Sequence, residues 1–147
     1  MISTRPELLQ TLIENLTQAI QDMHTGHSFP FGNFMLRKQQ VMILFFIYKK
    51  KGVATVKDVA NCLHVTPGAV TQFVDGLVEK KLVSREKNIN DGRIINIKLT
   101  TAAEKKFNKF KNDYYITASQ SFEGLSNNEL EQFIKLIKKI KITKQTK

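Results

Sequence analysis

Residues 56–75 contain the pattern that most constrains how this chain can fold. Two short helical segments are separated by a tight turn at His64, and the small residue Ala60 stands where the two helices would cross. Histidine tolerates the left-handed backbone that such a turn needs better than most residues, although glycine is usual there. Apolar residues occupy the positions that pack such a pair of helices, namely Val59, Leu63, Val65, Val70 and Phe73. The pattern predicts a helix-turn-helix, in which two helices cross steeply around a short turn.

The rest of the chain is mostly helical in its periodicity, with capping pairs that locate the helix starts. Thr4 with Glu7 and Ser126 with Glu129 have the spacing of a capping box. Thr66 precedes Pro67, a residue favoured in the first turn. The elements expected are helices over 5–24, 36–51 (ending at Gly52), 55–63 and 66–81, a loop over 25–32, and helices beginning at Thr101 (with Glu104 as its capping partner) and Ser126.

A change of period marks a β-hairpin after the second helix of the pair. Ile95, Ile97 and Leu99 alternate with polar residues, which indicates a strand, and residues 82–87 are a plausible partner strand. Residues 88–93 between them are rich in turn-forming residues. We call residues 84–98 the wing. We expect Asp91 to hold the Arg93 side chain by a charge-assisted bond.

Length and composition are those of one cytoplasmic domain. The chain has 147 residues, 41% of them hydrophobic, and one cysteine, which fits a reducing interior. No apolar core follows the N-terminal residues, so we expect no signal peptide. The longest apolar run, residues 41–48, is too short to span a bilayer and is interpreted as a buried helix.

The net charge of +10 suits a polyanionic partner. Residues 1–48 are neutral, whereas residues 49–98 and 99–147 each hold ten basic and five acidic side chains. The charge alone does not distinguish nucleic acid from an anionic membrane surface.

The exposed residues of the second helix of the pair favour duplex DNA. With Val70, Phe73 and Leu77 buried, the small and polar residues of its N-terminal half face outward. A recognition helix reads bases with this half, where glutamine pairs with adenine and threonine or alanine contacts the thymine methyl. An arginine at the tip of the wing suits a narrow minor groove. The candidate DNA-binding residues are Thr55, Lys57, Thr66, Pro67, Gly68, Ala69, Thr71, Gln72, Arg85, Lys87, Asp91 and Arg93.

Residues 55–101 resemble the MarR family of bacterial regulators. The resemblance is carried by residues 56–60, 66–71 and 77–83, by Asp91-Gly92-Arg93 and by Leu99-Thr100. Lys81 and Ala103 stand where the family usually has glycine. The resemblance implies a mainly α winged helix-turn-helix fold, with a lobe over 36–100 and dimerisation helices in 1–35 and 101–147, all within a single domain over 1–147. It implies a homodimer, recognition helices (66–81) in the major groove, wings in the minor groove, and a ligand cleft beside the DNA-binding lobe.

Several other features have two readings each. Cys62 is interpreted as a small core residue rather than a redox sensor. His24 and His27 are more typical of a solvated loop than of a zinc site, so no metal or cofactor is expected. Phe29, Phe31, Phe34 and Met35 are interpreted as core, with a pocket for a small aromatic effector as the alternative; that candidate pocket comprises His24, His27, Phe31, Phe34 and Met35. The lysine-rich face of the last helix is interpreted as solvated rather than phosphate-binding.

The function predicted is therefore that of a sequence-specific DNA-binding transcription regulator, a repressor relieved by an effector. No phosphate-binding loop, nucleophile elbow or zinc-protease helix suggests an enzyme. A winged-helix protein-interaction module and a nonspecific nucleic-acid binder are the two alternatives, and a selection from random duplexes would separate all three.

Overall fold

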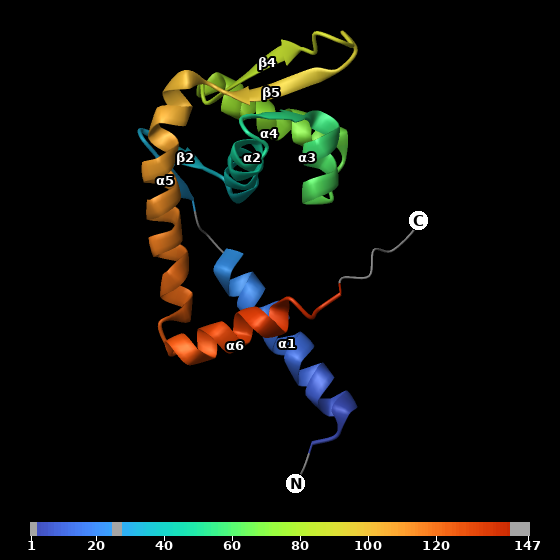
Figure 1. Ribbon diagram of the computed structural model, residues 1–147, viewed down its shortest axis with the longest axis vertical. Helices are drawn as coiled ribbons and strands as arrows, with labels where there is room; N and C mark the ends of the chain where they lie inside the picture. Colours follow the sequence, from blue (N-terminus) through green and yellow to red (C-terminus); the bar gives the residue numbers. More distant parts are fainter. Residues whose placement is uncertain (1–2, 25–27, 142–147) are drawn as a thin grey trace. The chain divides into compact units, whose positions relative to one another are not determined.

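The computed structural model describes residues 3–24 and 28–141, which fall into two compact units, 1–112 and 113–147 (Figure 1). In the first unit the elements are α1 (Arg5–His24), β1 (Phe29–Phe31), β2 (Phe34–Leu36), α2 (Lys38–Lys49), β3 (Val53–Thr55), α3 (Val56–Leu63), α4 (Pro67–Glu79), β4 (Val83–Lys87) and β5 (Ile95–Leu99). Helix α5 (Thr101–Ser119) spans the boundary, and a 3-10 turn (Gln120–Phe122) and α6 (Asn127–Ile137) follow. The winged helix-turn-helix fold is confirmed.

Helix α2 is at the centre of the lobe that carries the helix-turn-helix. It packs against α3, α4, β3 and β5, as its apolar run predicts. Gly76 of α4 allows a close approach, since a Cβ there would lie 2.7 Å from Nε2 of the buried Gln40. The core comprises Val41, Ile43, Leu44, Ile47, Val59, Val70, Val74, Leu77, Leu82, Val83 and Ile97. Phe73, expected in this core, is only half-buried, because Val74 takes the inward position on α4.

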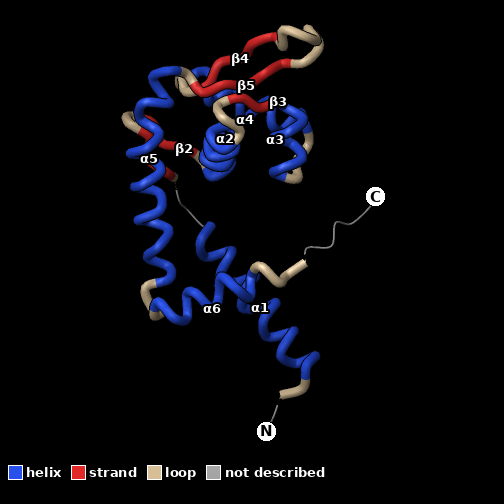
Figure 2. Tube along the Cα trace, viewed as in Figure 1, coloured by secondary structure: helices blue, strands red, loops and turns tan. Residues whose placement is uncertain are grey.

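The wing belongs to a three-stranded antiparallel sheet in the order β3-β5-β4 (Figure 2). Lys87 pairs with Ile95 at the outer end of the hairpin, so residues 88–94 form the wing tip. The sequence predicts only two strands. Strand β3 has three residues, too few to show an alternating pattern, and it exists because Val53 pairs with Lys98 far along the chain.

A second hairpin replaces part of the loop expected over 25–32. Strands β1 and β2 pair antiparallel, with Phe31 opposite Phe34. The two-residue connection begins with Gly32 at a φ of +57°, the glycine position of a type II′ turn. Gly32 and Pro30 were interpreted as loop residues, but they serve a tight hairpin instead. Residues 25–27 lie outside the described part of the chain.

Three helices of the lobe end on a non-glycine residue in the left-handed conformation. Lys51, His64 and Lys81 have φ values of 57°, 54° and 55°. After α2, the N–H of Lys51 donates to the carbonyl of Tyr48 and that of Gly52 to Ile47, which is a Schellman motif. Lys51 therefore takes the position that the sequence assigned to Gly52. His64 adopts the left-handed turn expected of it, and Lys81 shows why a glycine is usual at its position.

The caps of the last two helices are close to those predicted. At α6 the Glu129 carboxylate accepts from the backbone N–H of Ser126 at 2.8 Å, and these bonds to Ser126 lower the pKa of Glu129. At α5 the cap is Thr100, whose hydroxyl oxygen accepts from the N–H of Ala103 at 3.2 Å. The predicted pair of Thr101 and Glu104 is wrong by one residue.

Cys62 is exposed, and its assignment to the core is wrong. Helix α3 buries Val59 and Ala60, with Leu63 half-buried beside them. At about 100° per residue, Cys62 lies roughly 100° around the helix axis from the centre of that face.

The apolar faces of α1 and α6 are exposed. These faces comprise Leu8, Leu9, Leu12, Ile13, Leu16 and Ile20 on α1, and Ile134 and Ile137 on α6. Within the described ranges, no helix combines the length and the apolar character needed to cross a membrane.

Candidate nucleic-acid interface

The N-terminal turn of α4 presents small residues and a backbone donor to solvent. Thr66 caps the helix, with its hydroxyl oxygen accepting from the N–H of Ala69 at 3.2 Å. Pro67 has no N–H, and the N–H of Gly68 lies in the first turn, where a helix supplies no acceptor. Thr66, Pro67 and Gly68 are exposed and Ala69 is half-buried. This end of α4 is suited to an anion, because its donors and its dipole point the same way.

Thr71 and Gln72 are both exposed on α4. The Thr71 hydroxyl donates to the carbonyl of Pro67 at 3.0 Å, so its proton is already used within the helix. A hydroxyl bonded in this way still accepts hydrogen bonds. The geometry leaves Gln72 as the side chain of this turn with both amide functions available for a base edge.

Arg85 of β4 is directed to α4 rather than outward. Its Nη2 donates to the Asp75 carboxylate and, at 3.3 Å, to the carbonyl of Thr71. The pair joins the base of the wing to the middle of the recognition helix. Sequence reasoning treated Arg85 as a DNA contact and missed this bond, although an acidic residue on a helix that faces DNA signals a need for a cationic partner.

The wing tip is ordered by side chains that bond to its own backbone. Asn88 Oδ1 accepts from the N–H groups of Asn90 at 2.9 Å and Asp91 at 3.2 Å. Asp91 Oδ1 accepts from the backbone N–H of Arg93 at 3.0 Å, whereas the Arg93 Nε is 3.9 Å away. The expected bond from Asp91 to the guanidinium is therefore wrong in its detail: Asp91 shapes the turn and leaves the Arg93 side chain 96% exposed.

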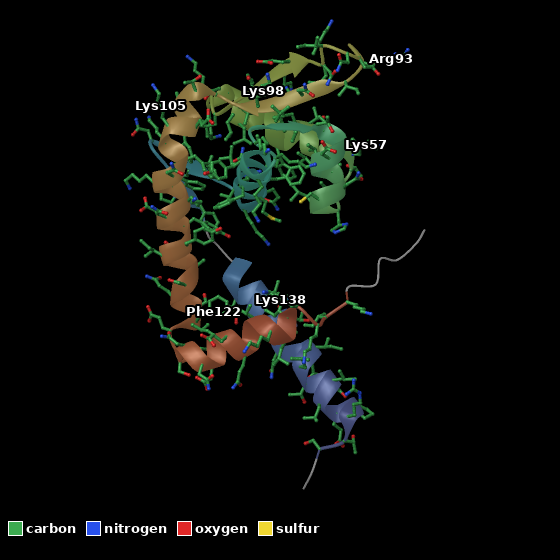
Figure 3. All side chains as sticks on the ribbon, in the orientation of Figure 1. Lys57, Arg93, Lys98, Lys105, Phe122 and Lys138 are labelled. Atoms are coloured by element: carbon green, nitrogen blue, oxygen red, sulfur yellow. The ribbon has the colours of Figure 1, made fainter. Side chains whose placement is uncertain are left out.

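Arg93 lies at the far end of the wing and Lys57 on α3 (Figure 3). Lys57 is exposed, as is Lys87 at the outer end of β4. Thr55 is half-buried, and its hydroxyl oxygen accepts from the N–H of Asp58 at 3.0 Å, so it caps α3. Of the two residues proposed at the start of α3, Lys57 is thus the better placed for a phosphate.

The residues of the candidate effector pocket have different surroundings. Phe31 is buried against Phe110, with ring centroids 4.8 Å apart. Phe34 and Met35, on β2, are exposed. His27 and the side chain of His24 lie outside the described residues, so the pocket and the zinc alternative stay predictions.

The lobe has the form of a winged helix-turn-helix DNA-binding protein, with a capped recognition helix beside a basic hairpin. The MarR family model matches residues 36–94. An uncharacterized HTH-type transcriptional regulator, YpoP of Bacillus subtilis, is 33% identical over 97 residues, which cover 64% of this chain and 67% of YpoP. The repressor MdtR of the same organism is 39% identical over 59 residues, 40% of this chain and 38% of MdtR.

Solved structures share the fold. A mutant of MarR from E. coli, complexed with operator DNA, has a TM-score of 0.74 at 22% identity, covering 93% of this chain and 98% of that one. An organohalide-sensing regulator bound to 2,4-dichlorophenol has a TM-score of 0.73 at 20% identity, covering 90% and 79%. The chain belongs to the MarR family and is a DNA-binding transcription regulator.

Proposed function

We propose that this regulator binds a pseudo-palindromic duplex as a homodimer, with α4 in the major groove and the wing in the minor groove. The single observation that carries the proposal is the exposure of Thr71 and Gln72 on a capped helix whose opposite face, Val70, Val74 and Leu77, is fully buried. A helix seated in this way presents its polar side to a groove without disturbing the core.

In the major groove, we assign base reading to Gln72, with the amide pairing to adenine, and methyl contacts to Ala69 and Thr71. The N-terminal end of α4, from Thr66 to Gly68, is assigned to a backbone phosphate. Lys57 adds a second phosphate contact. Phosphate contacts fix the orientation of the protein, whereas the base contacts specify the sequence.

In the minor groove, we assign the leading contact to Arg93. Its side chain is exposed at the end of an ordered turn, and a narrow groove concentrates negative potential. Lys87 is assigned to the flanking phosphates. Asp91 and Arg85 position these groups: the first bonds the turn and the second holds the wing to α4.

We assign dimerisation to residues 1–35 and 101–147, and DNA binding to the lobe over 36–100. The exposed apolar faces of α1 and α6 support the first assignment, because contiguous apolar surface of this extent marks an association site. A two-fold dimer would place half-sites about 34–36 Å apart. Light scattering on the full chain should give twice the monomer mass.

Repression relieved by a small aromatic effector completes the proposal. The phenol-bound structural relative supports it by analogy of fold alone. We expect a cytoplasmic protein without catalytic activity, because the relatives are named as transcription regulators. Titration of the protein–DNA complex with simple phenols should release DNA if an effector of this class acts.

Selection of the full-length protein against a pool of random duplexes tests DNA reading. We expect enrichment of one pseudo-palindrome. Equal binding to all duplexes would show a nonspecific binder, and binding to none would favour a protein-interaction module. Substituting Gln72 by alanine should then relax the preference at one position in each half-site.

A further inference from the structure

The wing tip exposes an isoleucine completely. Ile89 has a relative exposure of 101%, above that of every other large apolar side chain in the described part of the chain. It stands between Asn88 and Asn90, at the end of a hairpin that the comparisons place in a DNA-binding family. A single exposed apolar residue is common on protein surfaces, so its surroundings decide whether it has a role.

The backbone beneath Ile89 is fixed. Asn88 donates its N–H to the carbonyl of Ile94 at 2.9 Å, and the N–H of Ile94 donates to the carbonyl of Asp91 at 3.0 Å. These bonds add to the two that the Asn88 side chain accepts from the following N–H groups. The turn is therefore ordered before any partner binds, and it holds Ile89 outward at no further cost in conformational freedom.

The charges around Ile89 favour a nucleic-acid groove. Lys87 and Arg93 stand on either side of the tip in the sequence, and Arg93 extends from the end of the wing (Figure 3). The negative charge of Asp91 is turned to the backbone N–H of Arg93. An apolar side chain between two cations matches a minor groove, which has base edges on its floor and phosphates along both walls.

We propose that Ile89 enters the minor groove beside Arg93 and inserts between two base pairs as an apolar wedge. This inference rests on the proposed function of the wing. Aliphatic side chains that insert from the minor groove unstack one step and bend the duplex. The wedge would favour a pyrimidine–purine step under each wing, because these steps unstack most easily. The wing thereby reads deformability at a position where it forms no hydrogen bond to a base.

The test uses the full-length protein and the duplex enriched in the selection described above. Hydroxyl-radical footprinting locates the wing, and 2-aminopurine is placed at the protected step, where its fluorescence rises on unstacking. The variants are Ile89→Ser, Ile89→Leu, which keeps an aliphatic wedge, and Asn90→Ser as a control on the same turn. Circular dichroism and thermal melting confirm that each variant folds.

We expect the fluorescence to rise with the wild-type protein, Ile89→Leu and Asn90→Ser, and to stay low with Ile89→Ser. The affinity of Ile89→Ser should fall about tenfold on the pyrimidine–purine site, because a buried apolar contact is lost. It should fall less when that step is replaced by a stiff A-tract step. Wild-type fluorescence that stays low, or unchanged binding by Ile89→Ser, overturns the wedge while the footprint upholds the wing. If no duplex is bound at all, the proposed function fails together with the wedge.

Discussion

The bond between Arg85 and Asp75 makes a prediction that separates two roles for one arginine. If Arg85 contacts a phosphate, its removal weakens DNA binding whatever occupies position 75. If Arg85 instead holds Asp75, its removal leaves a carboxylate unpaired on the helix that enters the major groove. The structure supports the second role, since Nη2 of Arg85 already bonds Asp75 and the carbonyl of Thr71.

The expected magnitudes follow from exposure. The two side chains are 34% and 52% exposed, so the pair should add only about 0.2–1 kcal/mol to the free energy of unfolding. An unpaired carboxylate near the duplex should cost about 1 kcal/mol in binding, which is about fivefold in Kd. Arg85→Ala should therefore weaken binding about fivefold, and adding Asp75→Ala should restore most of the loss.

The assay is a double-mutant cycle by fluorescence anisotropy on the selected duplex, repeated at several salt concentrations. The Lys98–Glu86 pair, 2.6 Å apart within the wing sheet, provides a matched control whose cycle should show little coupling in DNA affinity. The reasoning is refuted if the double variant binds as weakly as Arg85→Ala and both lose about 0.9 from the salt slope, since that slope counts phosphate contacts.

Three further predictions concern the recognition surface and the helix ends. Gln72→Ala should cost about 1–3 kcal/mol of discrimination at one base position in a mutated-site binding series, whereas Arg93→Ala should lower affinity for all sites with that flank. Lys81→Gly should stabilise the protein by about 1 kcal/mol in urea denaturation at fixed protein concentration, because it removes a left-handed Cβ, while an alanine there should give no gain. Because bonds to Ser126 lower the pKa of Glu129 from its ordinary 4.5, its contribution should be complete above that value and lost as pH falls through the lowered pKa; Glu129→Gln should remove this dependence in acid titrations of helix content.

Local features of this protein could be read from the sequence because local chemistry sets them. The caps at Thr66 and Ser126 each depend on residues three positions apart, and both are present. The alternation of Ile95, Ile97 and Leu99 gave the wing strand for the same reason. His64 shows that even an unusual turn residue can be interpreted when the backbone it must adopt is known.

Where the sequence was misleading, the outcome depended on a distant partner or on which side of a helix faces the core. Strand β3 exists only because β5 is present to pair with it. Cys62 was placed in the core from its residue type, whereas its position on α3 turns it to solvent. Asp91 was paired with the nearest guanidinium, but the turn brought a backbone N–H closer.

By itself, the sequence determined that two capped helices and a basic hairpin would follow one another, since hydrogen bonds within a few residues and a periodic apolar pattern suffice for that. Only the tertiary structure decided what each exposed charge meets. Arg85 and Asp75 come from different elements, and packing of α4 against β4 is what brings them together. The same packing leaves Arg93 and Ile89 at the end of the wing without cover, because the tip extends beyond the last paired residues of its sheet.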